Sequence, residues 1–117
     1  MGLSTHVLDT MHGTPAAGMR VTLYATEGET LWQLKQFVLN QDGRNPGGLL
    51  LDATELQRGT YRLVFDVAAY FKACGVALPE PNFLNQVSLD FGVAAPDQHY
   101  HVPLLVSPWS YSTYRGS

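Results

Sequence analysis

The chain has 117 residues, of which 45% are hydrophobic and 15% are charged, and its formal net charge at pH 7 is −3. This length and hydrophobic content suit one folded domain over residues 1–117 and exclude a disordered chain. The mild acidity excludes the basic stripe of a nucleic-acid-binding protein, and the longest apolar-leaning run, residues 67–78, is too short for a membrane span. We therefore expect neither nucleic acid nor a membrane as a partner.

Alternation of apolar and polar residues predicts β-strands in three segments, which are residues 19–26, 61–66 and 87–92. Turns rich in glycine, proline and asparagine separate these segments. Short strands with regularly spaced turns favour an all-β antiparallel sandwich or barrel.

One segment departs from this alternation and predicts a short helix over about residues 66–74. Val67, Tyr70, Phe71 and Cys74 recur there at helical spacing. Asp66 is suited to the N-cap, and the glycine that follows Cys74 is suited to end the helix.

Cys74 is the only cysteine, which excludes an intrachain disulfide framework and a multi-cysteine zinc site. The first residues lack the basic and apolar regions of a signal peptide, so we expect a cytoplasmic protein. The low charged fraction indicates that part of the surface is hidden in an oligomer.

The histidines are the first candidates for chemistry: His6, His12, His99 and His101. His99 and His101 lie two residues apart on an expected strand, so their side chains point to the same face. This spacing is compatible with zinc if His6 or Asp9 adds a ligand, but no HExxH or Cys/His cluster supports a metal site. Each histidine can equally be an ordinary surface or hydrogen-bonded residue.

Two further features complete the candidates. Arg44 follows Asp-Gly in a glycine-rich turn, where it is either a polar turn residue or a clamp for an anion or a carbonyl group. No phosphate-binding glycine loop and no Gly-x-Ser-x-Gly motif of a serine hydrolase occurs. The C-terminal residues 107–117 carry Trp109, Tyr111 and Tyr114 in alternation, which favours a tail packed in a sheet.

Four segments of the chain resemble one known family. They are residues 3–9 (LSTHVLD), 42–44 (DGR), 99–105 (HYHVPLL) and 107–117 (SPWSYSTYRGS). The chain is thereby similar, over nearly its whole length, to the transthyretin-related family of 5-hydroxyisourate hydrolases. The terminal Tyr-Arg-Gly-Ser is the most specific part of the resemblance, because it separates these hydrolases from transthyretin itself.

The resemblance implies a transthyretin-like antiparallel β-sandwich of two four-stranded sheets with one short helix. It also implies a homotetramer with active sites at the dimer–dimer interface, and no metal or organic cofactor. The implied catalytic residues are His6, Arg44, His101 and Ser117. The implied substrate-binding residues are His6, Arg44, Tyr114 and Arg115. His12 and His99 fall outside this set.

The implied reaction is hydrolysis of 5-hydroxyisourate to 2-oxo-4-hydroxy-4-carboxy-5-ureidoimidazoline in urate degradation. In it His6 and His101 would orient and deprotonate water, and Arg44 would bind the substrate and stabilise the oxyanion. Tyr114 would hold the purine-like ring, and Ser117 would orient the histidine–arginine network. The alternative is a transthyretin-like protein that binds small aromatic ligands without catalysis.

Overall fold

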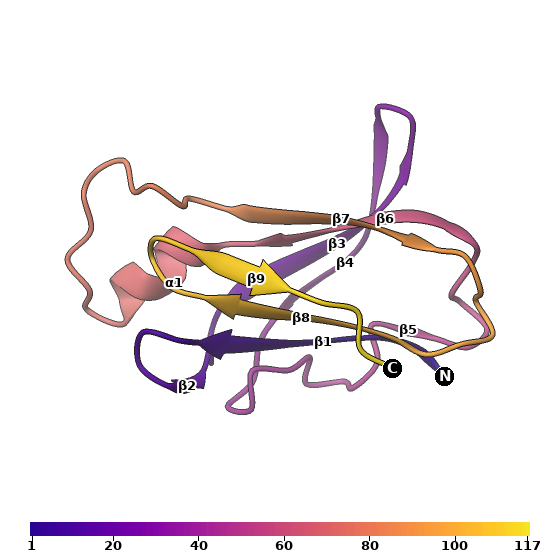
Figure 1. Ribbon diagram of the computed structural model, residues 1–117, viewed down its shortest axis with the longest axis horizontal. Helices are drawn as coiled ribbons and strands as arrows, with labels where there is room; N and C mark the ends of the chain where they lie inside the picture. The colour runs from indigo at the N-terminus through magenta and orange to yellow at the C-terminus, as the bar shows by residue number, and fades with distance from the viewer.

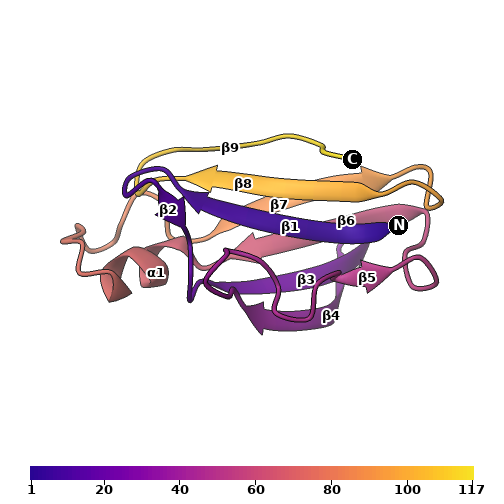
Figure 2. The ribbon, with the colours of Figure 1, turned by 90° about the horizontal axis from the view of Figure 1, so that it is seen from below.

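The computed structural model describes residues 1–117, and its strands form two layers with one short helix at one end (Figures 1 and 2). The elements in chain order are β1 (Gly2–Asp9), β2 (Thr14–Pro15), β3 (Arg20–Glu27), β4 (Thr30–Val38), β5 (Leu51–Asp52), β6 (Gly59–Phe65), α1 (Val67–Ala73), β7 (Val87–Val93), β8 (Tyr100–Val106) and β9 (Tyr111–Thr113). The two ends of the chain lie near each other, at the end of the sandwich opposite α1.

The two layers confirm the predicted all-β sandwich, although the pairing differs from the expectation in two details. One sheet has the order β2-β1-β8-β9, with β5 also paired to β1, so it has five strands instead of four. The other sheet has the expected four strands, in the order β4-β3-β6-β7. β1 and β8 are parallel, whereas all other pairs are antiparallel. A parallel pair can form because most of the chain separates these two strands.

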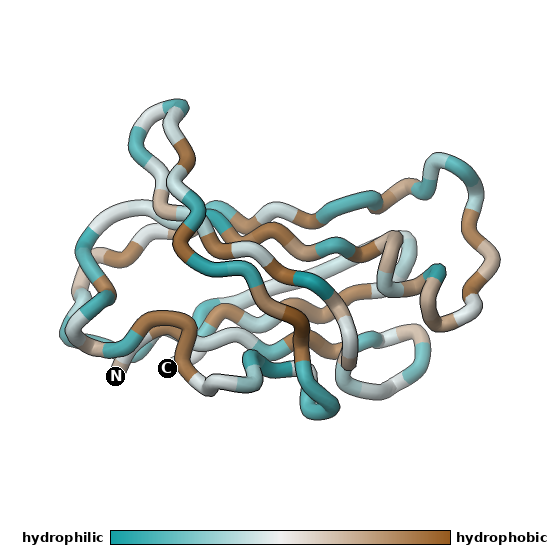
Figure 3. Tube along the Cα trace, turned by 180° about the vertical axis from the view of Figure 1, so that it is seen from behind, coloured by the Kyte–Doolittle hydropathy of each residue, from teal (hydrophilic) through white to brown (hydrophobic).

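The core lies between the sheets, and the alternation of the sequence explains which side chains enter it. Polar and apolar residues alternate along the strands (Figure 3). On β8, for example, Val102 and Leu104 point inward and are buried, whereas His101 and Leu105 are half-buried on the outer face. Of the buried apolar residues, 23 form one cluster. The three strand segments predicted from alternation correspond to β3, β6 and β7.

The predicted helix is confirmed over Val67–Ala73 and ends as expected. Gly75 adopts a φ of 85°, its N–H donates to the carbonyl of Lys72, and the N–H of Val76 donates to the carbonyl of Phe71. These two bonds form a Schellman motif, in which glycine tolerates the positive φ. Asp66 occupies the N-cap position, but its side chain makes no capping bond and instead accepts a hydrogen bond from Gln86.

β4 and β9 show which strands the alternation of polar and apolar residues can and cannot predict. β4 is largely exposed and includes the exposed side chains of Trp32 and Leu34, so it lacks the alternation that marks a half-buried strand. The C-terminal tail does join a sheet, as predicted, because β9 pairs with β8. The one helix, α1, is seven residues long, and no helix of this chain has the length and apolar character needed to cross a membrane.

Candidate active site

The candidate site is built on the outer face of the five-stranded sheet, where β1 and β8 lie side by side. The parallel register pairs Ser4 with His101 and His6 with Pro103. Because successive side chains of a strand point to opposite faces, Ser4, His6 and His101 all face outward, and all three are half-buried. The fold therefore brings together two histidines that are separated by most of the sequence.

Arg44 reaches this face through a loop that is attached to β1. The N–H of Val7 donates to the carbonyl of Gly43 over 2.9 Å, directly next to His6 in the sequence. Asn40 Oδ1 accepts hydrogen bonds from the backbone N–H groups of Asp42, at 2.9 Å, and Arg44, at 3.1 Å. These contacts fix the backbone of Arg44 beside the histidines.

Position 43 of this loop requires glycine. Gly43 has a φ of 72°, and a Cβ atom added there would lie 2.5 Å from the backbone oxygen of Val7. A side chain would therefore force the loop away from β1 and carry Arg44 with it.

The electrostatics of the site favour neutral histidines. Burial and the charge of Arg44 lower the pKa of His6 below its ordinary value of 6.5, against the opposing effects of the Asp42 backbone and side chain. Burial also lowers the pKa of His101, together with the charges of Arg44, His6 and His99. Both effects favour the neutral form of the two imidazoles, which is the form able to accept a proton, while Arg44 supplies a positive charge.

A serine connects His101 to a second histidine. Ser4 Oγ lies 2.8 Å from His101 Nδ1 and 3.0 Å from His99 Nε2. The predicted shared face of His99 and His101 is therefore confirmed. His99 belongs to the polar network of the site, although the resemblance had left it outside.

The C-terminal tail packs against His101 through its glycine. Gly116 and His101 exchange two backbone hydrogen bonds, of 2.7 and 3.2 Å. A Cβ atom at Gly116 would lie 3.0 Å from His101 Cδ2 and 3.1 Å from His101 Cβ. Ser117 is exposed, and its side chain makes no hydrogen bond within the chain. The tail therefore contacts His101 through Gly116.

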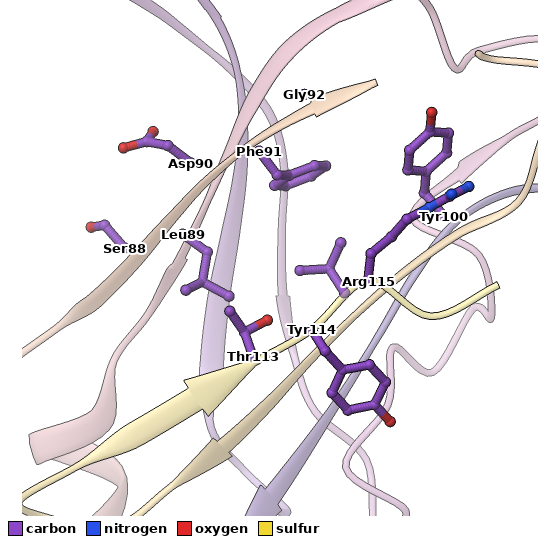
Figure 4. Close-up of a pocket in the computed structure, with 10 residues that line it drawn as sticks. Ser88, Leu89, Asp90, Phe91, Gly92, Tyr100, Thr113, Tyr114 and Arg115 are labelled. Atoms are coloured by element: carbon purple, nitrogen blue, oxygen red, sulfur yellow. The ribbon is translucent and has the colours of Figure 1, made fainter. Parts of the chain in front are cut away.

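Arg115 and Tyr114 lie elsewhere, at a cleft of about 350 Å³ between the edges of β7 and β9 (Figure 4). The guanidinium of Arg115 lies 4.2 Å from the ring centroid of Tyr100 and donates to Gln98 Oε1 and to the carbonyl of His99. The exposed ring of Tyr114 points away from Arg115 and Tyr100. In this chain Arg115 thus ties the tail to the turn that precedes β8.

The remaining histidine, His12, lies in a separate network at the other end of β1. Its Nδ1 lies 2.6 Å from the buried Asp9 Oδ2, which also accepts a hydrogen bond of 2.7 Å from the hydroxyl of Tyr70. Nowhere in the chain do three or more histidine, cysteine, aspartate or glutamate side chains gather as a metal-binding group.

Three residues of the site escaped the sequence reasoning. Asn40 carried no signal, because its contact with Arg44 is made by a side chain within an irregular loop. Gly43 was visible only as part of an Asp-Gly turn. Ser4 lies in the segment 3–9 that carries the resemblance, but only the pairing of β1 with β8 reveals its contacts with His99 and His101.

Comparison with known proteins shows which family the chain belongs to. Residues 3–116 match the model of the family described as "HIUase/Transthyretin family". The chain is 51% identical to the 5-hydroxyisourate hydrolase of Pseudomonas aeruginosa over 115 residues, which are 98% of this chain and 90% of that protein. The structure of the Klebsiella pneumoniae 5-hydroxyisourate hydrolase is 36% identical, with a TM-score of 0.77 and full coverage of both chains.

A longer relative contains a very similar unit. The crystal structure described as that of an (S)-allantoin synthase matches 99% of this chain at 46% identity and a TM-score of 0.93. The chain spans 43% of the length of that protein.

Proposed function

Because the chain belongs to the HIUase/Transthyretin family, we propose that it hydrolyses 5-hydroxyisourate to 2-oxo-4-hydroxy-4-carboxy-5-ureidoimidazoline in urate degradation. The observation that carries this proposal is the placement of His6 and His101 on one outer face of the paired strands β1 and β8, with the loop of Arg44 attached to β1 next to His6. Relatives of about 50% identity over nearly the whole chain bear the name of this hydrolase, which supports the same activity.

The reaction divides among these three side chains. His6 and His101 orient a water molecule and remove its proton as it attacks a ring carbonyl of the substrate, because a neutral imidazole accepts a proton readily near pH 7. Arg44 binds the substrate and stabilises the negative charge that develops on the attacked oxygen. Its attachment to β1 through Gly43 supports this task, since the donor is positioned before the substrate arrives.

The tail contributes to binding and to orientation. Tyr114 holds the purine-like ring, and Ser117 orients the histidine–arginine network through its hydroxyl or its terminal carboxylate. Arg115 binds the substrate in this scheme, although within one chain its guanidinium contacts Gln98 and Tyr100. The chemistry needs no metal and no organic cofactor.

The working form that we propose is a homotetramer, with active sites where two dimers meet. β7 and β9 are the edge strands of the two sheets, and both line one cleft, so a second copy can extend both sheets at once. The half-buried Leu8 and Leu105 lie on the outer face that carries the histidines. Covering this face with another dimer encloses the site.

The proposal also includes a cellular compartment and a single functional domain. We place the reaction in the cytoplasm, where an exposed free thiol such as that of Cys74 remains reduced. Residues 1–117 act as one domain, which the single core cluster supports.

A spectroscopic assay tests the function. The protein is added to urate that is being oxidised enzymatically, and the decay of the 5-hydroxyisourate absorbance is followed. We expect faster decay with the wild-type protein, and a far smaller acceleration with His101→Asn at equal concentration. Saturable binding of aromatic ligands without any acceleration by the wild type would instead favour the non-catalytic binding protein.

A further inference from the structure

The polar network continues behind His101, away from the groups that contact the substrate in the scheme above. Ser4 Oγ stands between His101 Nδ1, at 2.8 Å, and His99 Nε2, at 3.0 Å. Both distances lie in the range of ordinary hydrogen bonds. The parallel register of β1 and β8 holds Ser4 opposite His101, so the contact is fixed by backbone pairing.

A hydroxyl group carries one proton, so Ser4 donates to one histidine and accepts from the other. When His101 Nδ1–H donates to Ser4, the hydroxyl of Ser4 donates to His99 Nε2. This direction leaves His101 Nε2 without a proton, which is the form that a general base requires. In this direction the serine holds His101 in the Nδ1–H tautomer.

We propose that Ser4 and His99 form a proton relay behind His101. The inference rests on the proposed hydrolytic function. As water attacks, its O–H bond breaks and a bond from His101 Nε2 to hydrogen forms. The Nδ1–H proton of His101 passes to Ser4 Oγ, and the hydroxyl proton of Ser4 passes to His99 Nε2. The net result is one proton moved from water to His99, with His101 neutral again.

The charges around His101 explain why the proton should move away from its ring. His6 on β1, Arg44 on the loop attached to β1, and His99 all face His101, and each disfavours a positive charge on its ring. A proton that remained on His101 would stand beside the guanidinium of Arg44. His99 takes up the proton at the end of the network, and Arg115 approaches only its backbone carbonyl.

Ser4→Ala and Ser4→Thr test the relay as a pair, because only threonine keeps the hydroxyl. We expect Ser4→Ala to lower kcat at least about tenfold with little change in KM, since general base catalysis is worth about 10²–10⁴-fold. Ser4→Thr should recover most of kcat. Thr30→Ala is the control for loss of a hydroxyl group, because Thr30 is exposed at the start of β4, in the other sheet. A wild-type kcat in Ser4→Ala, or equal losses in Ser4→Ala and Ser4→Thr, would overturn the relay.

His99→Ala probes the far end of the relay without touching the core. We expect a reduced kcat in weakly buffered solution and its recovery on addition of free imidazole, which takes over the proton. A kcat equal to that of the wild type under weak buffering would contradict the assignment of His99.

A measurement without substrate separates the relay from the proposed function. The ¹⁵N chemical shifts of the His101 ring report which nitrogen carries the proton. We expect the Nδ1–H form in the wild type and in Ser4→Thr, and a mixture in Ser4→Ala. A mixture already present in the wild type would overturn the relay. Failure of the wild type to accelerate 5-hydroxyisourate decay would instead overturn the proposed function and leave the tautomer of His101 as measured.

Discussion

Two histidine networks lie on opposite faces of β1, and they are organised differently. On the outer face, the neutral hydroxyl of Ser4 joins His99 and His101, and all three side chains are half-buried. On the inner face, at the strand's end, the carboxylate of Asp9 is fully buried and accepts hydrogen bonds from His12 and Tyr70.

The difference shows why one network suits chemistry and the other suits stability. The carboxylate of Asp9 has donors on both of its oxygens, and Tyr70 belongs to α1, so this network holds the helix against the sandwich. A buried carboxylate that lost these donors would carry the full cost of its desolvation. The imidazoles near Ser4 keep a ring nitrogen available and are flanked by a fixed positive charge, which is what proton transfer requires.

The largest expected effect is a loss of activity when His101 of the outer network is replaced, but not when His12 of the inner network is replaced. His101→Asn should lower kcat/KM by about 10²–10⁴-fold, because it removes a general base, while the melting temperature stays close to that of the wild type. His12→Asn is the matched substitution in the other network and should leave kcat/KM nearly unchanged. The decay assay and thermal unfolding measure both variants; equal losses of activity in the two would erase the distinction.

The contact of the tail with His101 gives the next effect. Gly116→Ala places a methyl group 3.0 Å from His101 Cδ2, so the ring or the tail must shift. We expect about a tenfold or greater loss of kcat, since small displacements of catalytic groups are costly. Gly47→Ala is the control, because its Cβ would find its nearest neighbour, Asn45 Nδ2, at 3.6 Å. If both variants keep full activity, the position of the tail does not matter for His101.

A substitution in the inner network should change the stability of the protein instead of its activity. Tyr70→Phe removes one donor from the buried Asp9 carboxylate and should lower the free energy of unfolding by about 1–3 kcal/mol. Turnover by the remaining folded protein should stay at the wild-type level. Urea unfolding followed by tryptophan fluorescence measures the first quantity and the decay assay the second. A Tyr70→Phe variant that keeps wild-type stability would show that the bond to Asp9 does not anchor α1.

Acid should affect the two networks in different pH ranges. Activity needs neutral His6 and His101, whose pKa values lie below 6.5, so kcat/KM should persist below pH 6.5 and fall as these lowered values are crossed. Burial alone would raise the pKa of Asp9, but the hydrogen bonds from Tyr70 and His12 lower it below 3.8. The stability from Asp9 is therefore fully present above about pH 4 and is lost at lower pH.

Removing the charge of Arg44 should change the pH dependence of activity without changing the pH dependence of stability. Arg44→Gln should raise the pKa of His6 and of His101, because that charge is one cause of their lowering, and should leave the acid unfolding of the protein unchanged. NMR titration of the histidine rings measures the first effect and circular dichroism against pH the second. An unchanged pKa of His101 in this variant would show that Arg44 lies too far away to act on it.

Much of the architecture follows from local pattern. Alternation in residues 19–26, 61–66 and 87–92 marks strands that are half-buried between two layers, and helical spacing with a terminal glycine marks α1. β4 escapes this reasoning because it lies exposed at the edge of its sheet, where no alternation is needed. The resemblance placed His6, Arg44 and His101 together, and the structure brings these three side chains near one another.

What the sequence by itself determined is therefore where β3, β6, β7 and α1 form, and which faces of these strands are polar. Only the tertiary structure decided that β1 and β8 run parallel and in which register, because that pairing depends on packing across the whole sandwich. This register sets Ser4 against His101, 97 positions apart in the chain. The loop that carries Arg44 is likewise placed by a long-range backbone bond to Val7, which no local pattern encodes.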